Sequence, residues 1–244
     1  MKKLLTGCLA LTLLLSLALP VRAAEDDPLL TLVNPWNTIP EDWQVELVSV
    51  GSGHRVDKRC YDDLMAMLEA CRAAGLKPIV RSSYRTQATQ KQLYENKVRQ
   101  WRGYGYSEAN ARKKAATIVA VPGTSEHQLG WAVDLVDAAY QVLDEKQADT
   151  AAQQWLMAHS WEYGFILRYP TDKSAVTGII YEPWHYRYVG REHAKDIYDS
   201  GLCLEEWLEA RAAAEELRAA VADAIAAQLE EARRRAYILL RRQG

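Results

Sequence analysis

Two short segments of the 244-residue chain concentrate side chains that bind metals or transfer protons. Residues 125–134 read Ser-Glu-His-Gln-Leu-Gly-Trp-Ala-Val-Asp, and residues 182–186 read Glu-Pro-Trp-His-Tyr. A hydrolytic zinc site needs three protein ligands, one position open to water, and a separate carboxylate that accepts the proton of that water. The candidates for Zn²⁺ ligands are His127, Asp134 and His185, and the candidate for the base is Glu182.

Asp134 is the most informative of these residues. It lies inside the apolar run Trp-Ala-Val-Asp-Leu-Val, which predicts a buried strand. A carboxylate in such a strand is costly to bury unless a metal ion or another cation offsets its charge.

Glu182 and His185 are three residues apart, with Pro183 between them. Proline disfavours a helix interior, so the helical arrangement of an ordinary zinc protease is not expected here. An irregular strand can still direct both side chains to one metal. Spacing alone leaves two alternatives open, a metal site or histidines with purely structural roles.

The two segments together resemble the paired signature of the VanY-type D-alanyl-D-alanine carboxypeptidases. The pattern is Ser-x-His-x-x-Gly-x-Ala-x-Asp followed by Glu-x-Trp-His, and every signature position is matched. That family belongs to a larger group with the lysostaphin-type peptidases and the zinc domain of hedgehog proteins. The resemblance covers about residues 28–208. It implies that the two histidines and Asp134 bind zinc and that Glu182 is the catalytic base.

The resemblance also implies residues that bind substrate. The family carries Ser-x-Tyr-Arg with a downstream Gln, found here as Ser-Ser-Tyr-Arg at 82–85 and Gln90. Arg85 would pair with the terminal carboxylate of the substrate or with the developing oxyanion, since a guanidinium suits a carboxylate through two parallel hydrogen bonds. Arg81 would share this task, and Ser125 and Gln90 would be secondary substrate contacts. Without the resemblance, both arginines would be interpreted as surface residues of a loop.

The activity implied is that of a zinc-dependent carboxypeptidase that removes C-terminal D-alanine from peptidoglycan stem peptides. Two alternatives keep the same zinc centre: an L,D-carboxypeptidase acting on tetrapeptide stems, or an endopeptidase that cuts wall cross-links. A third is a non-catalytic, zinc-stabilised wall-binding module, since hedgehog proteins share the architecture. The presence of Glu182 together with Arg85 favours an enzyme, because a binding module requires neither.

The elements that must position these residues follow from periodicity and from turn residues. Strands and helices do not alternate one for one, which indicates an α+β fold with a small, mostly antiparallel sheet packed by helices. Pro183 is expected to mark a bulge or an edge in its strand. The predicted helices are 57–74, 86–101, 107–120, 150–163 and 191–200, and the predicted strands are 77–83, 131–136, 165–169 and 179–189.

Composition divides the chain into four segments. These are a signal peptide at 1–23, an extended lead-in at 24–55, a single zinc peptidase domain at 56–208, and a helical C-terminal extension at 209–244. From Leu204 onward the chain is rich in Ala, Glu, Leu and Arg, which predicts one long helix with an interruption near Ala210.

The N-terminus has the pattern of an export signal. Lys2 and Lys3 precede an apolar stretch at 9–19, and cleavage is expected after Ala23. The expected location is therefore extracellular or in the cell envelope. Loss of this segment removes three basic residues and no acidic ones, so the formal charge changes from −2 to −5. An acidic chain gives no electrostatic basis for nucleic acid binding.

Three cysteines remain after cleavage, and an exported protein is permitted a disulfide. Cys60 and Cys71 fall on one predicted helix about 16 Å apart, too far to bond to each other. An internal bridge would therefore involve Cys203. The alternative is that all three are small buried apolar residues.

The end of the chain is basic, with five arginines after residue 232. One interpretation is a solvated helix that packs on the domain or on a second copy. The other is a weak contact of this basic end with anionic wall polymer or with a membrane surface.

Overall fold

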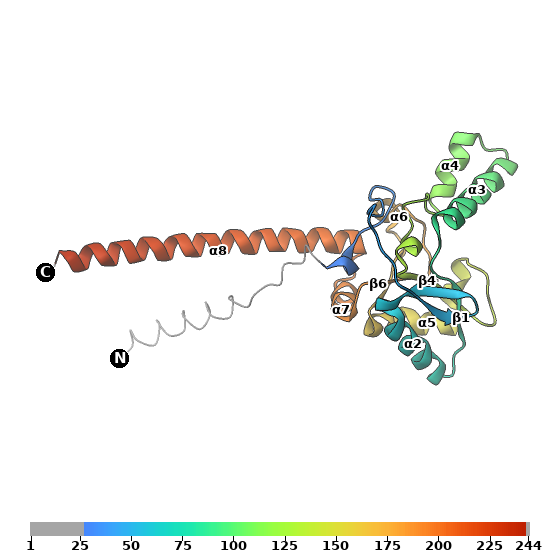
Figure 1. The fold of residues 1–244 in the computed structure, drawn as a ribbon, viewed down its shortest axis with the longest axis horizontal. Coiled ribbons are helices and arrows are strands. Elements are labelled where there is room, and N and C mark those ends of the chain that lie inside the picture. The colour runs from blue at the N-terminus through green and yellow to red at the C-terminus, as the bar shows by residue number, and fades with distance from the viewer. Residues whose placement is uncertain (1–26, 243–244) are drawn as a thin grey trace. The chain divides into compact units, whose positions relative to one another are not determined.

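The computed structural model describes residues 27–242, and Figure 1 shows the arrangement of its elements. The chain divides into two compact units between Thr31 and Leu32. In the first unit the described residues form one 3₁₀ turn, η2 (Pro28–Leu30), whose preceding Asp27 accepts a hydrogen bond from the Leu29 amide. The predicted signal peptide lies outside the described residues. Among the described helices, none combines the length and apolar character needed to cross a membrane.

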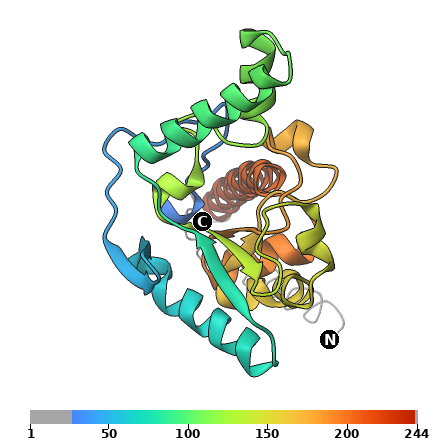
Figure 2. The ribbon, with the colours of Figure 1, turned by 90° about the vertical axis from the view of Figure 1, so that its right-hand side faces the viewer.

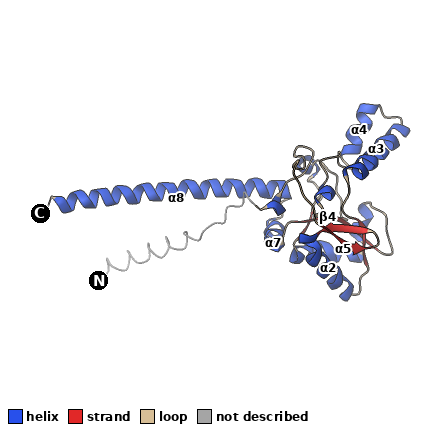
Figure 3. Ribbon diagram, viewed as in Figure 1, coloured by secondary structure: helices blue, strands red, loops and turns tan. Residues whose placement is uncertain are grey.

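The second unit is built on a four-stranded antiparallel sheet, as predicted for an α+β fold (Figure 3). Its strand order is β3-β4-β6-β5, and a separate hairpin is formed by β1 and β2. The strands are β1 (Leu47–Gly51), β2 (His54–Asp57), β3 (Pro78–Ser82), β4 (Ala132–Asp137), β5 (Phe165–Leu167) and β6 (His185–Tyr188).

One face of the sheet is covered by two helices, α2 (Lys58–Ala73) and α5 (Ala151–His159). The tyrosines of β6 reach across this interface. Tyr186 donates a hydrogen bond to Gln153 of α5, and Tyr188 donates one to Asp63 of α2. In Figure 2 the two helices lie below the sheet, while α3 and α4 rise above it. The opposite face is therefore the one left for a site.

A helical hairpin of α3 (Gln87–Gly103) and α4 (Glu108–Ala116) has a small core of its own. Tyr94 and Val98 of α3 pack there against Ala111 and Ala115 of α4. Both N-termini are capped, since the side chains of Thr86 and Ser107 accept backbone amide hydrogen bonds. The remaining short elements are η3 (Glu126–Leu129), η4 (Glu145–Asp149), η5 (Ser160–Tyr163), α6 (Ser174–Thr177) and α7 (Arg191–Ser200).

The C-terminal helix, α8 (Leu204–Arg241), runs without a break, so the predicted interruption near Ala210 is wrong. Alanine has the highest intrinsic helix propensity, and no proline or glycine interrupts this segment. Leu204 and Trp207 in its first turn are buried, whereas the side chains beyond residue 211 are nearly all exposed.

Two other predictions differ from the structure. The segment 24–55, expected to be an extended lead-in, contains β1, because alternating apolar residues next to a Gly-Ser-Gly turn form a hairpin. The predicted strand 179–189 is shorter, since only β6 pairs with its neighbours. Pro183 cannot donate to a sheet and lies in a turn, closed by a 3.1 Å hydrogen bond from the His185 amide to the Glu182 carbonyl.

All three described cysteines are buried free thiols, so the bridge involving Cys203 does not form. Cys60 and Cys71 face inward from α2, as their helical spacing predicts. They contribute to the core as small apolar residues.

Gly130 connects the first signature segment to the β1–β2 hairpin. Its φ is +82°, a left-handed conformation that favours glycine. Its carbonyl accepts a 2.9 Å hydrogen bond from the Asp57 amide. A Cβ atom here would lie 3.1 Å from Val45 and from the Asp57 side chain. The glycine of the signature is thus required by backbone geometry, not by chemistry.

Asp57, which contacts Gly130, lies at the end of β2 and precedes α2, and its side chain stabilises this connection. Its buried carboxylate caps α2 and accepts two hydrogen bonds from the Arg59 side chain, at 2.8 and 3.0 Å. Although burial raises the pKa of Asp57, these hydrogen bonds hold it below the usual value. We expect Asp57→Asn to lower the free energy of unfolding at pH 7 by about 1 kcal/mol.

The difference in free energy of unfolding between the native chain and Asp57→Asn should become smaller as the pH falls. A lowered carboxyl pKa contributes stability above the unfolded-state pKa, near 4, and loses it as pH falls through the folded-state pKa. Urea unfolding of both proteins at pH 7 and at about pH 3.5 measures this. A difference in free energy of unfolding that increases toward low pH would contradict the lowered pKa of Asp57.

Candidate active site

Two neighbouring strands and one 3₁₀ turn bring the predicted ligands together. Asp134 on β4 pairs in register with His185 on β6, so both side chains project to the same face of the sheet. His127 comes from η3, just before β4. One candidate ligand atom from each residue lies within 4.8 Å of the others, and all three side chains are buried.

His127 is held in one orientation. Its Nδ1 lies 2.9 Å from the carbonyl oxygen of Ser83, which can only accept a hydrogen bond. Nδ1 therefore carries the hydrogen, and Nε2 presents its lone pair 3.3 Å from Asp134 Oδ1. Burial, with the nearby Arg85, lowers the pKa of His127 to about 4. The ring is thus neutral at pH 7, the form that binds a metal.

His185 is oriented by carboxylates on both sides. Its Nε2 lies 3.5 Å from Glu126 Oε2, an ion-pair distance slightly long for a hydrogen bond, and its Nδ1 lies 3.2 Å from Asp134 Oδ1. Burial alone would lower the pKa of His185, but Asp134 and Glu126 raise it to about 9. The distances make Nδ1 the atom that would bind a metal after losing its proton, with Nε2 directed to Glu126.

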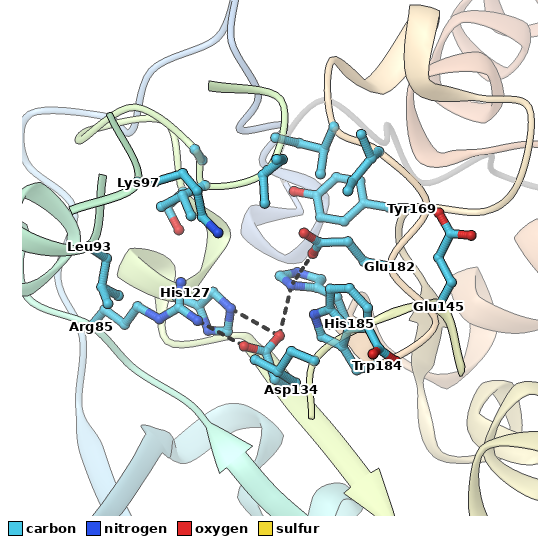
Figure 4. Close-up of a pocket in the computed structure, with 18 of the residues that line it drawn as sticks. Arg85, Leu93, Lys97, His127, Asp134, Glu145, Tyr169, Glu182, Trp184 and His185 are labelled. Carbon is cyan, nitrogen blue, oxygen red and sulfur yellow. Dashed lines mark hydrogen bonds and ion pairs between the residues drawn. The ribbon is translucent and has the colours of Figure 1, made fainter. Parts of the chain in front are cut away.

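Asp134 divides its two carboxylate oxygens between two tasks. Oδ2 accepts a 2.8 Å hydrogen bond from Arg85 (Figure 4). Oδ1 is buried and has no hydrogen bond from any of residues 27–242. The separations of Oδ1 from the two imidazole nitrogens, 3.3 and 3.2 Å, match the edge of a tetrahedral zinc site, ~3.3 Å for bonds of ~2.0 Å. A buried anionic oxygen without a donor, between two imidazoles, fits Zn²⁺ well.

Glu182 lies beside the three candidate ligands but is not one of them. Its Oε2 is 3.7 Å from His185 Nδ1, and the side chain lines the same cavity. Burial raises the pKa of Glu182 to about 8, with His185 opposing and Asp134 adding to the shift. A bound divalent cation would favour the ionised form and oppose this shift. The carboxylate is thus placed to exchange a proton with a water molecule that such a cation would bind.

Arg85 has a role that the sequence did not reveal. Besides Asp134, it contacts Ser82 at 2.9 Å and Gln90 at 3.4 Å. It therefore neutralises Asp134 and is itself held in place by its neighbours. It also lines the cavity, and a guanidinium has five N–H donors, so donors remain for a substrate anion.

The other predicted substrate residues are placed differently from one another. Ser125 is buried and lines the cavity. Gln90 is fully buried, donates to the Ala120 carbonyl at 2.7 Å and accepts from Arg85, so it supports Arg85 and is not among the lining residues. Arg81 is exposed and is likewise absent from the lining, because alternation along β3 directs it away from Ser82.

Sequence reasoning missed a buried charge network behind the ligands. Glu126 accepts 2.7 Å hydrogen bonds from Arg168 and Arg187, and all three side chains are fully buried. Arg168 also binds Glu205 of α8 through two hydrogen bonds, at 2.8 and 2.6 Å. The network thus connects the first turn of α8 to the far side of His185. The available signal was Glu126 itself, an acid adjacent to His127 in an otherwise buried segment.

The site opens into one cavity of about 850 Å³. Its floor holds the candidate ligands together with Glu182 and Arg85, and one wall is a face of α3. A cavity of this size can enclose most of a drug-sized molecule.

Comparison with known proteins identifies similar sequences and structures. The family described as VanY, D-alanyl-D-alanine carboxypeptidase, matches residues 53–191. A D-alanyl-D-alanine carboxypeptidase of Enterococcus faecalis is 47% identical over 180 residues, which cover 73% of this chain and 65% of that protein. The chain thus spans about two thirds of the length of this relative.

Two solved structures are also similar. One is VanYB in complex with D-alanine-D-alanine, with a TM-score of 0.69 and 46% identity, covering 74% of this chain and 97% of that one. The other is a Glu-to-Ala variant of a VanY D,D-pentapeptidase in complex with Zn(II), with a TM-score of 0.68 and 46% identity, covering 73% and 98%. Both structures share the fold of this chain, and the second of them contains the metal that is proposed here.

The position of Glu126 predicts an effect on metal binding. A carboxylate facing the far nitrogen of a ligating histidine orients the ring, and its loss commonly costs 10- to 100-fold in metal affinity. We expect Glu126→Gln to raise the zinc dissociation constant by roughly that factor. Competition with a chelating zinc indicator measures it.

Glu209→Gln is the matched control, because Glu209 is exposed on α8 and has no partner among residues 27–242. Circular dichroism of each variant establishes that it is folded. A folded Glu126→Gln with unchanged zinc affinity would show that Glu126 supports only the fold.

Proposed function

The chain belongs to the VanY family of D-alanyl-D-alanine carboxypeptidases, and on this premise we propose that it removes the C-terminal D-alanine from peptidoglycan stem peptides. The observation that carries the proposal is the combination in one cavity of a His-Asp-His ligand set, a separate buried Glu182 and a cationic Arg85. A purely structural zinc site would use four protein ligands and would need neither of the last two.

The proposed chemistry assigns a task to each side chain. Zinc, when bound, supplies a Lewis acid that polarises the scissile carbonyl and acidifies water. Glu182 accepts a proton from the attacking water and later delivers it to the nitrogen of the leaving D-alanine. His127 and Asp134 hold their ligand atoms in fixed orientations through Ser83 and Arg85.

Arg85 explains why the proposed enzyme is an exopeptidase. Arg85 lines the cavity and donates a hydrogen bond to the ligand Asp134. A free terminal carboxylate can pair with this cation, whereas an internal peptide bond offers no such anion. The same cation could instead stabilise the oxyanion of the transition state.

Amino acid release tests the proposal directly. We expect the purified, zinc-loaded full chain to release D-alanine from a pentapeptide stem. Glu182→Ala should abolish turnover, by at least about 1,000-fold, yet retain zinc, because Glu182 is not a ligand. Chromatography of the released amino acids and elemental analysis of bound zinc provide the two measurements.

Each other outcome identifies one of the alternatives. Release from a tetrapeptide stem, with or without release from the pentapeptide, would indicate L,D-carboxypeptidase activity. Cleavage of cross-linked muropeptides alone would indicate an endopeptidase. No release by the zinc-loaded chain would favour a binding module, and loss of zinc from Glu182→Ala would make Glu182 a ligand and overturn its role as base.

We further propose that the chain is exported through residues 1–23 and acts at the cell envelope, where its substrate lies. A weak contact of the basic end of α8 with anionic wall polymer or membrane would hold it there, and the supporting observation is that Arg233, Arg234 and Arg235 are exposed. Cell fractionation of the native chain and of a variant with these three residues changed to Gln tests both ideas. We expect an envelope-bound fraction that falls in the variant, and a purely cytoplasmic chain would refute export.

A further inference from the structure

The cavity extends well beyond the metal ligands along one face of α3. Leu93, Asn96, Lys97 and Gln100 line this wall, and their spacing of three, four and seven residues places them on a single helix face. The lining also includes Leu143, Glu145 and Ile180. A terminal D-alanine and its neighbour would fill only the end next to the ligands, so this distal part is available to the rest of a longer peptide.

Lys97 is the cation of the α3 wall. Its side chain is partly buried, and it has no hydrogen bond or ion pair with any residue in 27–242. Figure 4 shows it directed into the cavity, above His127 and Arg85. Other polar residues of α3 do have partners: Asn96 accepts from Arg99, and Glu95 pairs with Arg112 at 3.0 Å. Among the cations of α3, Lys91 and Lys97 have no hydrogen bond or ion pair within residues 27–242, and of these two only Lys97 lines the cavity.

The surroundings of Lys97 favour an anionic ligand. The nearby lining is largely apolar and includes Leu93, Ile118 and Val119. An ammonium group held against apolar surface loses part of its hydration, and a carboxylate that arrives with a bound ligand restores a strong partner. Of the three cationic side chains that line the cavity, Arg85 lies beside the ligands and Lys97 lies farther along α3, whereas Lys146 is exposed on η4.

The spacing between Arg85 and Lys97 indicates which group of the substrate reaches Lys97. Gln90 contacts Arg85, and Lys97 follows it by seven residues, which is roughly 10 Å along the helix axis. An extended peptide advances ~3.3–3.6 Å per residue. If Arg85 receives the terminal carboxylate, Lys97 lies near the residues two or three positions before the C-terminus.

We propose that Lys97 is a specificity-determining residue that binds an internal carboxylate of the stem peptide. This inference rests on the proposed function and deepens it. Two groups of a pentapeptide stem have this chemistry at about the right distance: the side-chain carboxylate of diaminopimelate at the third position, and the free α-carboxylate of D-glutamate at the second. A stem with lysine at the third position and D-isoglutamine at the second offers neither carboxylate.

The test compares the zinc-loaded full chain with Lys97→Met and with Lys91→Met. Lys91 is an exposed lysine of the same helix that does not line the cavity, so it is the matched control. The substrates are acetyl-D-alanyl-D-alanine and pentapeptides with diaminopimelate, amidated diaminopimelate or lysine at the third position, each with D-glutamate or D-isoglutamine at the second.

For Lys97→Met we expect the ratio of kcat/KM for a carboxylate-bearing pentapeptide to that for acetyl-D-alanyl-D-alanine to fall about tenfold, as for one lost charge-assisted hydrogen bond. Lys91→Met should keep the ratio of the native chain. If the fall in this ratio disappears when diaminopimelate is amidated, Lys97 binds the carboxylate of the third residue. If it disappears when D-isoglutamine replaces D-glutamate, Lys97 binds the carboxylate of the second residue.

Two results would overturn the inference. An equal loss on the short substrate would show that Lys97 binds the terminal carboxylate, and an unchanged ratio for every pentapeptide would show that it binds no substrate anion. Calorimetric binding of the same peptides to Glu182→Ala and to Glu182→Ala with Lys97→Met gives the same comparison without turnover. If the native chain releases nothing, the proposed function fails, and a weaker affinity caused by Lys97→Met still supports the subsite.

Discussion

The arrangement of the site depends on the carboxylate of Asp134. It is an ionised group in the middle of a buried strand, and burial of such a group is tolerated only when each oxygen has a cationic or metal partner. Arg85 satisfies Oδ2, and this leaves Oδ1 between the nitrogens of two histidines. The register of β3 with β4, and of β4 with β6, places Ser82, Asp134 and His185 side by side.

A second carboxylate, Glu126, extends the same principle behind the site. Its charge is compensated by Arg168 and Arg187, which are themselves buried, and Arg168 is in turn compensated by Glu205. Breaking such a network by removing one member commonly costs 3–5 kcal/mol, since an uncompensated charge is left behind. The first turn of α8 is therefore part of the domain that holds the ligands, although the rest of that helix is exposed.

The differences between expectation and structure have physical causes that lie outside local sequence. The strand predicted at 179–189 pairs only from His185 onward, because Pro183 removes a donor and a turn replaces the ladder. The hairpin of β1 and β2 follows a stretch interrupted by Pro28, Pro35 and Pro40, and its position depends on the close approach of Gly130 to Asp57. The contacts of Arg85 could not be predicted, because Asp134 follows it by 49 residues.

The sequence alone determined the α+β class, most helix boundaries, the four residues proposed for chemistry and the family. These follow from periodicity, from capping and turn residues, and from two signature segments whose residue types match one reaction. Tertiary structure alone decided which imidazole nitrogens face the metal position and that Arg85 is shared between Asp134 and the cavity. It also decided that Arg81 points away and that Lys97 has no hydrogen bond or ion pair within residues 27–242. The reason is that the orientation and charge of a buried side chain are set by partners tens of residues away. Such contacts cannot be inferred from the local pattern of residues.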